Sequence, residues 1–307
     1  PSFQASGEEM HSTRGRANLL RALISGRFPE PAVGEEAVHT ALDLCLACKG
    51  CKAECPSAVD VARLRCEFID HYYESHRRPL RDYLFGYIER LARLGRAFAP
   101  LANPLLESKA LGGLRQGVLG IARQRSLPGL NRRSLRGLWA AEQARLPQRP
   151  VQEQVLFLSD PFSEYFHPAA GLAALRLLHA AGCQVQILPV TGSGRTLISK
   201  GFLKAARRQA EQVLQAVQSF DPTGQMAVVG IEPSEILTLR DEYLDFFPGQ
   251  AAYESLAERA WMIDEFLLRP GPDGTPRHLR IDEHHRHKMT AEKVLLHGHC
   301  YQKAQPP

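Results

Sequence analysis

Four closely spaced cysteines constrain this chain more than any other feature. They are separated by two, two and three residues, and Pro56 follows the last of them. They are Cys45, Cys48, Cys51 and Cys55. This is the spacing of a [4Fe–4S] loop, in which three thiolates bind one cubane and the fourth reaches a second cluster. We expect Gly50 to supply unusual backbone geometry and Pro56 to end the loop. Structural zinc, the alternative, is usually held by two separated Cys-x-x-Cys pairs. The spacing therefore favours an iron–sulfur centre.

Length and composition indicate a protein of two domains in a reducing compartment. The 307 residues include 44% hydrophobic residues, enough for two cores, and contain no run of about twenty apolar residues that could span a bilayer. Seven cysteines, four of them within eleven residues, do not resemble a secreted disulfide framework, so we expect a cytoplasmic protein. The chain begins with Pro1 rather than a start methionine or a signal peptide, and we expect a fragment truncated at both ends.

Residues 1–96 show helical periodicity on both sides of the cysteine loop. Apolar side chains recur at helical spacing over 17–24, 35–44 and 59–74, and again over 80–91. Ser12 or Thr13 is a candidate N-cap of the first helix, which Gly26 would end. Asp60 places a negative charge at the start of the third helix. We predict an all-helical ferredoxin-like domain over residues 1–96.

Residues 97–150 form a basic, partly helical segment that is broken by prolines. Between residues 109 and 149 there are nine basic residues and one acid, Glu142. This composition is typical of a solvated linker. The alternative is a docking surface for an acidic partner, a missing domain or anionic lipid head groups, and the last would place the protein peripherally at the inner face of the membrane. No recognition motif accompanies the charge, and the net charge is only +5, so we expect no nucleic-acid partner.

Residues 151–307 alternate short apolar strands with longer helical patterns. We expect strands at 155–158, 184–190, 226–230 and 294–297, and helices at 168–181, 202–220, 234–243 and 253–268. The alternation predicts an α/β domain with a mostly parallel sheet, so the expected fold class of the chain is α + α/β. Residues 270–288 are expected to form a loop, which is either solvated or a metal site, because it contains four histidines. These are His278, His284, His285 and His287.

The sequence also resembles a known family. The run Cys-Leu-Ala-Cys-Lys-Gly-Cys-Lys-Ala-Glu-Cys-Pro-Ser, followed by Pro-Leu-Arg-Asp at 79–82, is similar to the iron–sulfur half of fused FAD-binding/(Fe-S)-binding oxidoreductases. These are D-2-hydroxyacid dehydrogenases of the D-lactate and D-2-hydroxyglutarate type, related to glycolate oxidase iron–sulfur subunits. Dispersed segments extend the resemblance over essentially the whole chain. They are 12–21, 194–203, 232–234, 238–243 and 298–300.

This resemblance implies cofactors and a ligand set. The intact protein would hold two [4Fe-4S] clusters, with FAD in a portion that is missing here. In the family a first cysteine motif lies upstream, and Pro1 corresponds to the proline after its last cysteine. Cys45, Cys48 and Cys51 would then share one cluster with that thiolate, while Cys55 would serve the other. Neither cluster would be completely ligated by this chain.

The α/β region resembles the cysteine-rich domain of glycolate oxidase, anaerobic glycerol-3-phosphate dehydrogenase and heterodisulfide reductase subunits. It departs from that pattern at three places. Residues 191–195, Thr-Gly-Ser-Gly-Arg, stand where the domain usually carries Cys-Cys-Gly. Glu235 stands where a cysteine often follows Glu-Pro-Ser, and Tyr301 ends the usual His-Cys-His. The resemblance therefore lacks the cysteine pair and the cysteine after Glu-Pro-Ser, whereas Cys300 is kept.

A few residues of this region remain as functional candidates. Cys300, with His299 beside it, is the candidate for an additional functional thiol. Gly192, Gly194 and Arg195 form a candidate anion-binding turn at the start of a helix, the alternative being a tight turn with a surface arginine. The remaining cysteines are expected in the core. They are Cys66 and Cys183.

From these observations we expect an electron-transfer module of a flavin-linked D-2-hydroxyacid dehydrogenase. Electrons would pass from FAD, held by a flavin-binding domain or subunit, through the clusters to a quinone or cytochrome acceptor. No catalytic residue is assigned within this chain. Positive charge on Lys49 and Lys52 would raise the cluster potential. Two alternatives stay open: a stand-alone iron–sulfur subunit of a glycolate- or glycerol-3-phosphate-oxidising complex, and a non-catalytic docking scaffold.

Overall fold

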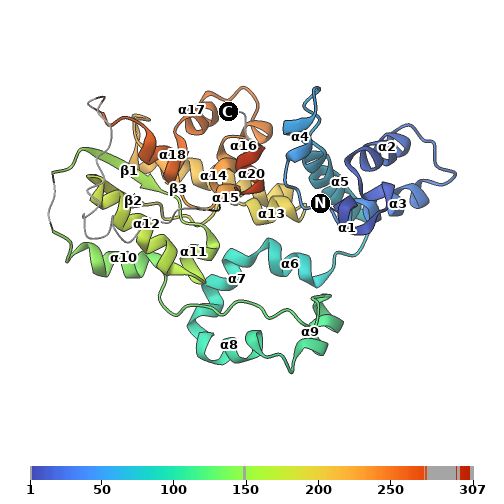
Figure 1. Cartoon of the computed structure of the whole chain (residues 1–307), viewed down its shortest axis with the longest axis horizontal. Coiled ribbons are helices and arrows are strands. Elements are labelled where there is room, and N and C mark those ends of the chain that lie inside the picture. The colour runs from blue at the N-terminus through green and yellow to red at the C-terminus, as the bar shows by residue number, and fades with distance from the viewer. Residues whose placement is uncertain (1, 148–149, 273, 275–294, 296–297, 305–307) are drawn as a thin grey trace.

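The computed structural model describes residues 2–147, 150–272, 274, 295 and 298–304. Helices within residues 2–75 lie at one end of the molecule, and a small four-stranded sheet with its helices lies at the other (Figure 1). Helices within residues 80–119 form a lobe below both in that view. This arrangement agrees with a helical region combined with an α/β region. The domain boundaries near 96 and 150 stay predictions.

Three helices around the cysteine loop form where the sequence predicted them, and three short elements that were not predicted accompany them. The predicted helices are α2 (Thr13–Ile24), α3 (Pro31–Asp43) and α5 (Val61–Ser75), and the short elements are α1 (Ser2–Ser6), η1 (Glu9–His11) and α4 (Gly50–Glu54). The side chain of Ser12 caps α2 by accepting a hydrogen bond from the backbone N–H of Gly15, and Asp60 caps α5 in the same way. Gly26 follows α2 in the left-handed conformation, with φ of 64°. A small buried core holds these helices together. It consists of Leu20, Val38, Leu42 and Val61.

The next segment is also largely helical. The helix predicted over 80–91 is divided at Tyr87 into α6 (Leu80–Gly86) and α7 (Ile88–Gly95). The basic segment that follows contains η2 (Arg96–Phe98), α8 (Ala99–Glu107), α9 (Gly112–Leu119) and α10 (Leu135–Gln143). Leu135 and Trp139 of α10 are buried in the same core as the sheet. Tertiary packing of this apolar face therefore stabilises α10, although its surroundings in the sequence are basic.

The sheet is parallel throughout, as the alternating pattern predicted. Its strands are β1 (Glu153–Phe157), β2 (Cys183–Ile187), β3 (Ala227–Gly230) and β4 (Ala260–Met262), in the order β2-β1-β3-β4. Val155 of β1 is in register with Val185 of β2 and with Ala227 of β3. Because both faces of a parallel sheet are covered, the central strands are apolar almost without interruption.

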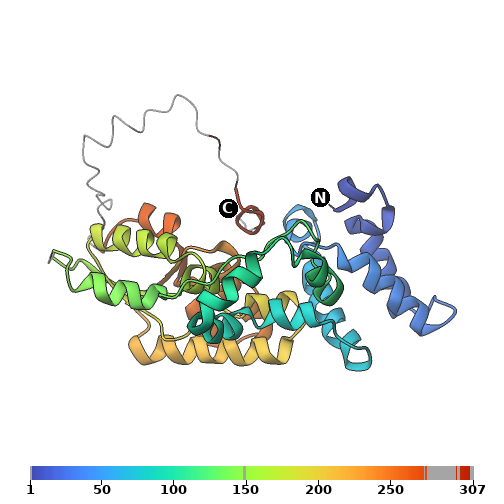
Figure 2. The same ribbon diagram turned by 90° about the horizontal axis from the view of Figure 1, so that it is seen from below.

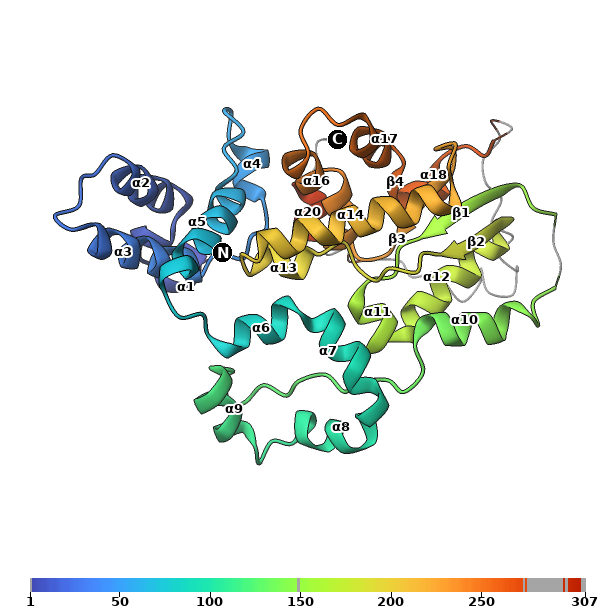
Figure 3. The same cartoon turned by 180° about the vertical axis from the view of Figure 1, so that it is seen from behind.

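Helices cover the two faces of this sheet (Figures 2 and 3). Their bounds are α11 (Pro161–Tyr165), α12 (Pro168–Ala180), α13 (Arg195–Ser199), α14 (Leu203–Phe220), α15 (Pro233–Ile236), η3 (Leu237–Leu239), α16 (Glu242–Phe246), α17 (Ala251–Glu258) and α18 (Ile263–Leu268). Leu156 and Val228 lie in one core cluster with α14, whereas Val155, Phe157 and Val229 lie in another with α10 and α12. Alternate residues of each strand thus face opposite layers.

The sequence predictions for the last third of the chain need correction. The predicted helix 253–268 is wrong, because β4 interrupts it between α17 and α18. Three residues carry too little pattern to identify a strand, and only pairing with β3 defines this one. The predicted helix 234–243 is divided into α15, η3 and the start of α16. The predicted strand 294–297 and the histidine loop lie largely outside the described residues. The histidines that fall outside are His278, His284, His285 and His287.

The helical and α/β regions share a hydrophobic core. Cys66 of α5 belongs to the same buried cluster as side chains of the sheet and of α14. The turn after α13 packs so closely on α5 that a Cβ at Gly201 would lie 2.6 Å from Cγ2 of Ile69. Arg65 donates a hydrogen bond to the carbonyl of Ser199 at 2.9 Å. The cysteine loop, which leads directly into α5, is therefore held against the α/β region. Within the described part of the chain, no helix is both long enough and apolar enough to cross a bilayer.

Candidate metal centre

The four predicted ligands lie on the short segment between α3 and α5. Cys45 follows α3 closely, Cys51 lies within α4, and Cys55 comes directly after α4. All four thiols are free and half-buried. The other two cysteines predicted to be structural, Cys66 and Cys183, are buried in the core as expected.

The backbone of this segment is unusual at two residues for which the sequence predicted no special conformation. Ala47 and Lys49 adopt left-handed conformations, with φ of 50° and 58°, although neither is a glycine. Each such conformation costs about 1–3 kcal/mol and is found most often at functional sites. Gly50 was expected to supply this geometry. Instead it begins α4 with an ordinary backbone, and a Cβ there would only touch Sγ of Cys48 at 3.7 Å.

Three of the cysteines open onto one cavity. It has a volume of about 290 Å³, and Cys45, Cys48 and Cys51 all line it. Cys55 is not part of its wall. The wall is completed mainly by the N-terminal helices. Its other members are Ser2, Phe3, Gln4, His11, Ser12, Thr13, Arg16, Leu46 and Val61. The fold thus divides the four thiols into a group of three and a single one.

Backbone N–H groups point at two of the sulfurs. Burial raises the pKa of the Cys51 thiol, and N–H groups at the start of α5, on Ala62 and Val61, oppose this shift. Hydrogen bonds from the N–H groups of Val59 and Ser57 lower the pKa of Cys55. Such donors favour the thiolate form, which is the form that binds metals. Hydrogen bonds to sulfur also tune the potential of iron–sulfur clusters.

These thiols and donors match the chemistry of an iron–sulfur site. Among the described residues, however, no three His, Cys, Asp or Glu side chains are grouped as they would be around a metal ion. Three of the thiols line a common cavity without being drawn together into a closed centre. The assignment of Cys45, Cys48, Cys51 and Cys55 as ligands therefore stays a prediction.

A buried ion network joins the cysteine loop to the α/β region. The ammonium of Lys49 lies 2.6 Å from Asp241, 3.1 Å from Glu242 and 3.3 Å from Asp60, and its side chain is only 2% exposed. Burial lowers the pKa of Lys49, but the three carboxylates outweigh it, so the balance is a raised pKa and a permanent charge. Lys52, which is more exposed, also pairs with Asp241, at 2.8 Å.

The α/β region contributes two more groups to this network. The guanidinium of Arg195 pairs with Glu242 and donates a hydrogen bond to the carbonyl of Ala47 at 3.2 Å. The hydroxyl of Tyr301, on α20 (Cys300–Lys303), donates to Glu242 at 2.5 Å. Burial raises the pKa of Tyr301 and the Glu242 carboxylate raises it further, so the phenol keeps its proton. The left-handed residue Ala47 is thus tied to Arg195.

The candidate anion-binding turn has a different environment from the one expected. Gly192 and Gly194 are left-handed, with φ of 68° and 88°, which explains the need for glycine there. Arg195 is buried rather than exposed, and Glu242 already balances its charge. Anion binding at this turn stays a prediction, and nothing in the geometry leaves Arg195 available for it.

The candidate thiol Cys300 is exposed at the start of α20. His299 caps this helix by accepting a hydrogen bond from the N–H of Tyr301, and its Nε2 lies 3.9 Å from Glu232. The histidine is therefore oriented by its helix and by a carboxylate. The functional role of Cys300 and His299 stays a prediction.

Sequence reasoning noted Glu235 only as a missing cysteine and gave it no role. Its carboxylate is buried and accepts hydrogen bonds from both the backbone N–H and the hydroxyl of Ser193, each at 2.6 Å. Burial raises the pKa of Glu235 to about 7. The signal available was in the resemblance: a serine-containing turn and a carboxylate both stand where the resembled domain usually carries cysteines, and these are complementary hydrogen-bonding groups.

Comparisons with known proteins agree with the resemblance drawn from the sequence. The chain is 27% identical to D-2-hydroxyglutarate dehydrogenase of Escherichia coli K12 over 88% of this chain and 30% of that protein. It is 28% identical to the Pseudomonas putida enzyme of the same name, over 92% of this chain and 32% of that protein. The chain thus spans about a third of the length of these relatives.

A third relative is a subunit rather than a complete enzyme. The chain is 30% identical to a subunit of the anaerobic glycerol-3-phosphate dehydrogenase of Escherichia coli K12, over 56% of this chain and 43% of that subunit. No protein-family model matches the chain, and no solved structure is significantly similar to it. The relatives are named as dehydrogenases or as subunits of oxidoreductases, and one of them, from Bacillus subtilis, is named a probable glycolate oxidase iron-sulfur subunit.

Proposed function

We propose that this chain is the iron–sulfur electron-transfer module of a flavin-linked D-2-hydroxyacid dehydrogenase. The observation that carries the proposal is the cavity lined by Cys45, Cys48 and Cys51, with backbone donors at the sulfur of Cys51. Similarity to D-2-hydroxyglutarate dehydrogenases supports a D-2-hydroxy acid as the substrate class. Oxidation of such an acid to the 2-oxo acid releases two electrons and two protons, which FAD in a partner domain or subunit would accept.

Within this proposal the cysteines serve two clusters. Cys45, Cys48 and Cys51 would hold one [4Fe-4S] cluster in the cavity, with a fourth ligand from outside the described residues. Cys55, which lies apart from the cavity and has its own N–H donors, would serve the second. When bound, such clusters pass single electrons onward, here from reduced flavin to a quinone or cytochrome acceptor.

The chain's own residues hold the loop and set its surroundings. The N–H groups of Val61 and Ala62 stabilise a thiolate at Cys51. Lys49 was expected to raise the cluster potential, but three carboxylates within 3.3 Å offset most of its charge. We therefore assign Lys49 to fastening the loop on the α/β region, with Arg195 holding the carbonyl of Ala47 from the other side.

A separate iron–sulfur subunit is the second candidate. Similarity to the anaerobic glycerol-3-phosphate dehydrogenase subunit, and to a probable glycolate oxidase iron-sulfur subunit of Bacillus subtilis, favours it. In that case FAD would belong to another polypeptide. Purification of the native protein distinguishes the two, because flavin and iron would lie on one chain in the fused enzyme and on separable chains in the complex.

Anaerobic iron and acid-labile sulfide analysis of the full-length protein, with EPR after dithionite reduction, tests the proposal. We expect about eight irons and about eight sulfides per chain with two cluster signals. Cys45→Ser should remove about half of the iron, whereas Cys66→Ala, a buried cysteine outside the cavity, should keep all of it. Zinc without sulfide, or equal iron loss in both variants, would rule the electron-transfer role out.

A further inference from the structure

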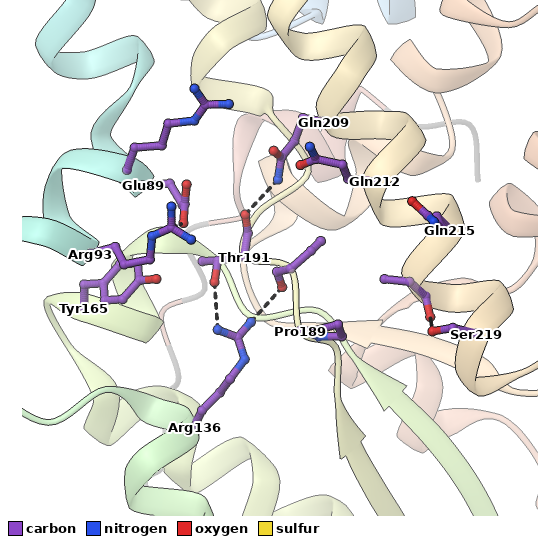
Figure 4. A pocket seen from close by; sticks show the side chains of 13 residues that line it. Glu89, Arg93, Arg136, Tyr165, Pro189, Thr191, Gln209, Gln212, Gln215 and Ser219 are labelled. Atoms are coloured by element: carbon purple, nitrogen blue, oxygen red, sulfur yellow. Dashed lines mark hydrogen bonds and ion pairs between the residues drawn. The ribbon is translucent and has the colours of Figure 1, made fainter.

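A second cavity, unrelated to the cysteines, lies between α7, α10, α14 and the loop that follows β2 (Figure 4). Its volume is about 720 Å³, within the range of about 300–1,000 Å³ that is usual for small-molecule sites. Residues 189–191, just beyond the carboxyl end of β2, line it, and ligands of parallel α/β sheets bind at that edge. No cysteine lines it and it shares no lining residue with the cysteine cavity, so it is independent of the proposed iron–sulfur function.

The wall of this cavity is positively charged. Arg90, Arg93 and Arg136 line it, and of the described residues on its wall only Glu89 is acidic. Burial raises the pKa of Glu89, whereas the positive charges of Arg93, Arg90 and Arg136 lower it. All three guanidinium groups are therefore near enough to act on this one carboxylate. Tyr165 also lines the cavity, and burial raises its pKa, so it contributes a neutral hydroxyl.

Arg136 builds the floor of the cavity. Its guanidinium donates to the carbonyls of Leu188 and Val190, each at 2.7 Å, and to the hydroxyls of Thr191 at 3.0 Å and Ser159 at 3.2 Å. These bonds fix the loop after β2, and they leave Arg136 without a free pair of N–H donors for a ligand. Its charge is partly offset by an ion pair with the buried carboxylate of Glu164 at 3.5 Å, so Arg136 shapes the cavity rather than supplying a free charge.

Arg90 and Arg93 are different, because their donors remain available. Among the described residues, neither guanidinium donates a hydrogen bond. Arg93 approaches Glu89 only to 4.0 Å and its side chain is 61% exposed, and Arg90 lies over the ring of Tyr87 at 5.5 Å. A guanidinium presents five N–H donors in a fork that matches a carboxylate or phosphate group. Two such forks stand one turn apart on α7.

The opposite wall supplies neutral hydrogen-bonding groups. Gln209, Gln212 and Gln215 follow one another at three-residue intervals on α14 and all line the cavity (Figure 4). Gln209 is engaged by the carbonyls of Thr191 and Gly192, at 3.1 and 3.0 Å. Gln212 and Gln215 are exposed at the rim, where their amides can bind the hydroxyl or carbonyl groups of a ligand.

We infer that this cavity binds a small organic polyanion, a molecule that carries two or more carboxylate or phosphate groups. The paired guanidinium forks of Arg90 and Arg93 recognise the oxyanions, and the amides of Gln212 and Gln215 bind its neutral polar groups. Arg136 holds the loop that forms the floor beneath these groups. Carboxylate and phosphate share the chemistry that these forks recognise, so the experiment separates the two.

Isothermal titration calorimetry of the full-length protein with pyrophosphate and, separately, with citrate tests this inference. The variant Arg90→Gln/Arg93→Gln should weaken binding of the accepted probe at least about tenfold, since charge-assisted hydrogen bonds contribute about 1.5–3 kcal/mol each. The matched control is Arg21→Gln/Arg27→Gln, which removes the same charge from two exposed arginines in or just after α2, at the other end of the molecule (Figure 1). The control should bind like the unmodified protein.

The outcomes are distinct. Binding of pyrophosphate alone identifies a phosphate ligand, and binding of citrate alone identifies a carboxylate ligand. Either result supports the site if Arg90→Gln/Arg93→Gln loses affinity for the probe and the control variant does not. If neither probe binds, or if the control loses as much affinity as the cavity variant, the inference is wrong. Iron content and the unfolding midpoint should be unchanged in both variants, because the replaced arginines are exposed and none of them lines the cysteine cavity.

Discussion

Replacing Lys49 by methionine should destabilise the protein strongly, because it leaves buried carboxylates without their cation. Asp60, Asp241 and Glu242 are all less than 10% exposed in their side chains, and all lie within 3.3 Å of the Lys49 ammonium. Removal of one partner from such a buried network costs about 3–5 kcal/mol. Methionine keeps the length and most of the apolar volume of lysine, so the loss should come mainly from charge.

Lys52→Met is the matched control for this change. It lies on the same loop and pairs with the same Asp241, but its side chain is 37% exposed. Exposed ion pairs contribute only about 0–1 kcal/mol. With a urea m-value of about 3 kcal/mol/M, Lys49→Met should lower the unfolding midpoint by about 1–2 M and Lys52→Met by no more than about 0.3 M.

The effect of Lys49→Met should also depend on pH. Burial raises the pKa of Asp241, but the ammonium groups of Lys49 and Lys52 more than offset this, and the net pKa is lowered. A carboxylate with a lowered pKa stabilises the fold fully above its unfolded pKa of about 3.9, and this stabilisation is lost as the pH falls through the folded value. In Lys49→Met the largest lowering influence is lost, so burial should raise the pKa of Asp241, which should take up a proton at a higher pH than in the unmodified protein. The difference in stability between the unmodified protein and Lys49→Met should therefore be largest at and above neutral pH and shrink as the pH falls and the unpaired carboxylate becomes protonated. Equal midpoints for the Lys49 and Lys52 variants at neutral pH would refute the reasoning.

Three further predictions concern stability, each measured by urea unfolding. Burial raises the pKa of Glu235 from 4.5 to about 7, so the folded protein keeps this proton to a higher pH than the unfolded chain does. The free energy of unfolding should therefore fall by about 3 kcal/mol as the pH rises from about 4.5 to 7. Glu235→Gln should abolish this fall, and an unchanged dependence of stability on pH in the variant would contradict the prediction. Gly201→Ala should lower the free energy of unfolding by about 2–5 kcal/mol, because the added methyl group meets Ile69. Gly26 has the same φ of 64° but open space around it, so Gly26→Ala should lower the free energy of unfolding by only about 1–2 kcal/mol. Leu175 is fully buried on α12, so Leu175→Ala should lower the free energy of unfolding by about 2–5 kcal/mol. Leu177 on the same helix is 38% exposed, and Leu177→Ala should lower it by less than about 1 kcal/mol. Similar losses in the two variants would argue against the packing described.

Much of the local architecture could be predicted from the sequence because it depends on short spacings. The cysteine intervals, the apolar periodicity of α2, α3 and α5, and the cap at Ser12 all involve residues within about one or two helical turns of one another. The parallel sheet could be predicted because strands and helices alternate along the chain. The strand β4 could not be predicted, because three residues show no periodicity of their own.

The candidate centre divides in the same way. Residue spacing alone was enough to identify the four cysteines that lie together in one candidate ligand loop. The folded chain was needed to show that Lys49 is a buried cation, because its partner Asp241 is 192 residues away in the chain. The arginine cavity likewise brings together α7, α10 and α14, which are distant in sequence. Local patterns depend on residues that are close in the sequence. The burial and charge balance of a side chain depend on partners that only folding brings within a few ångströms.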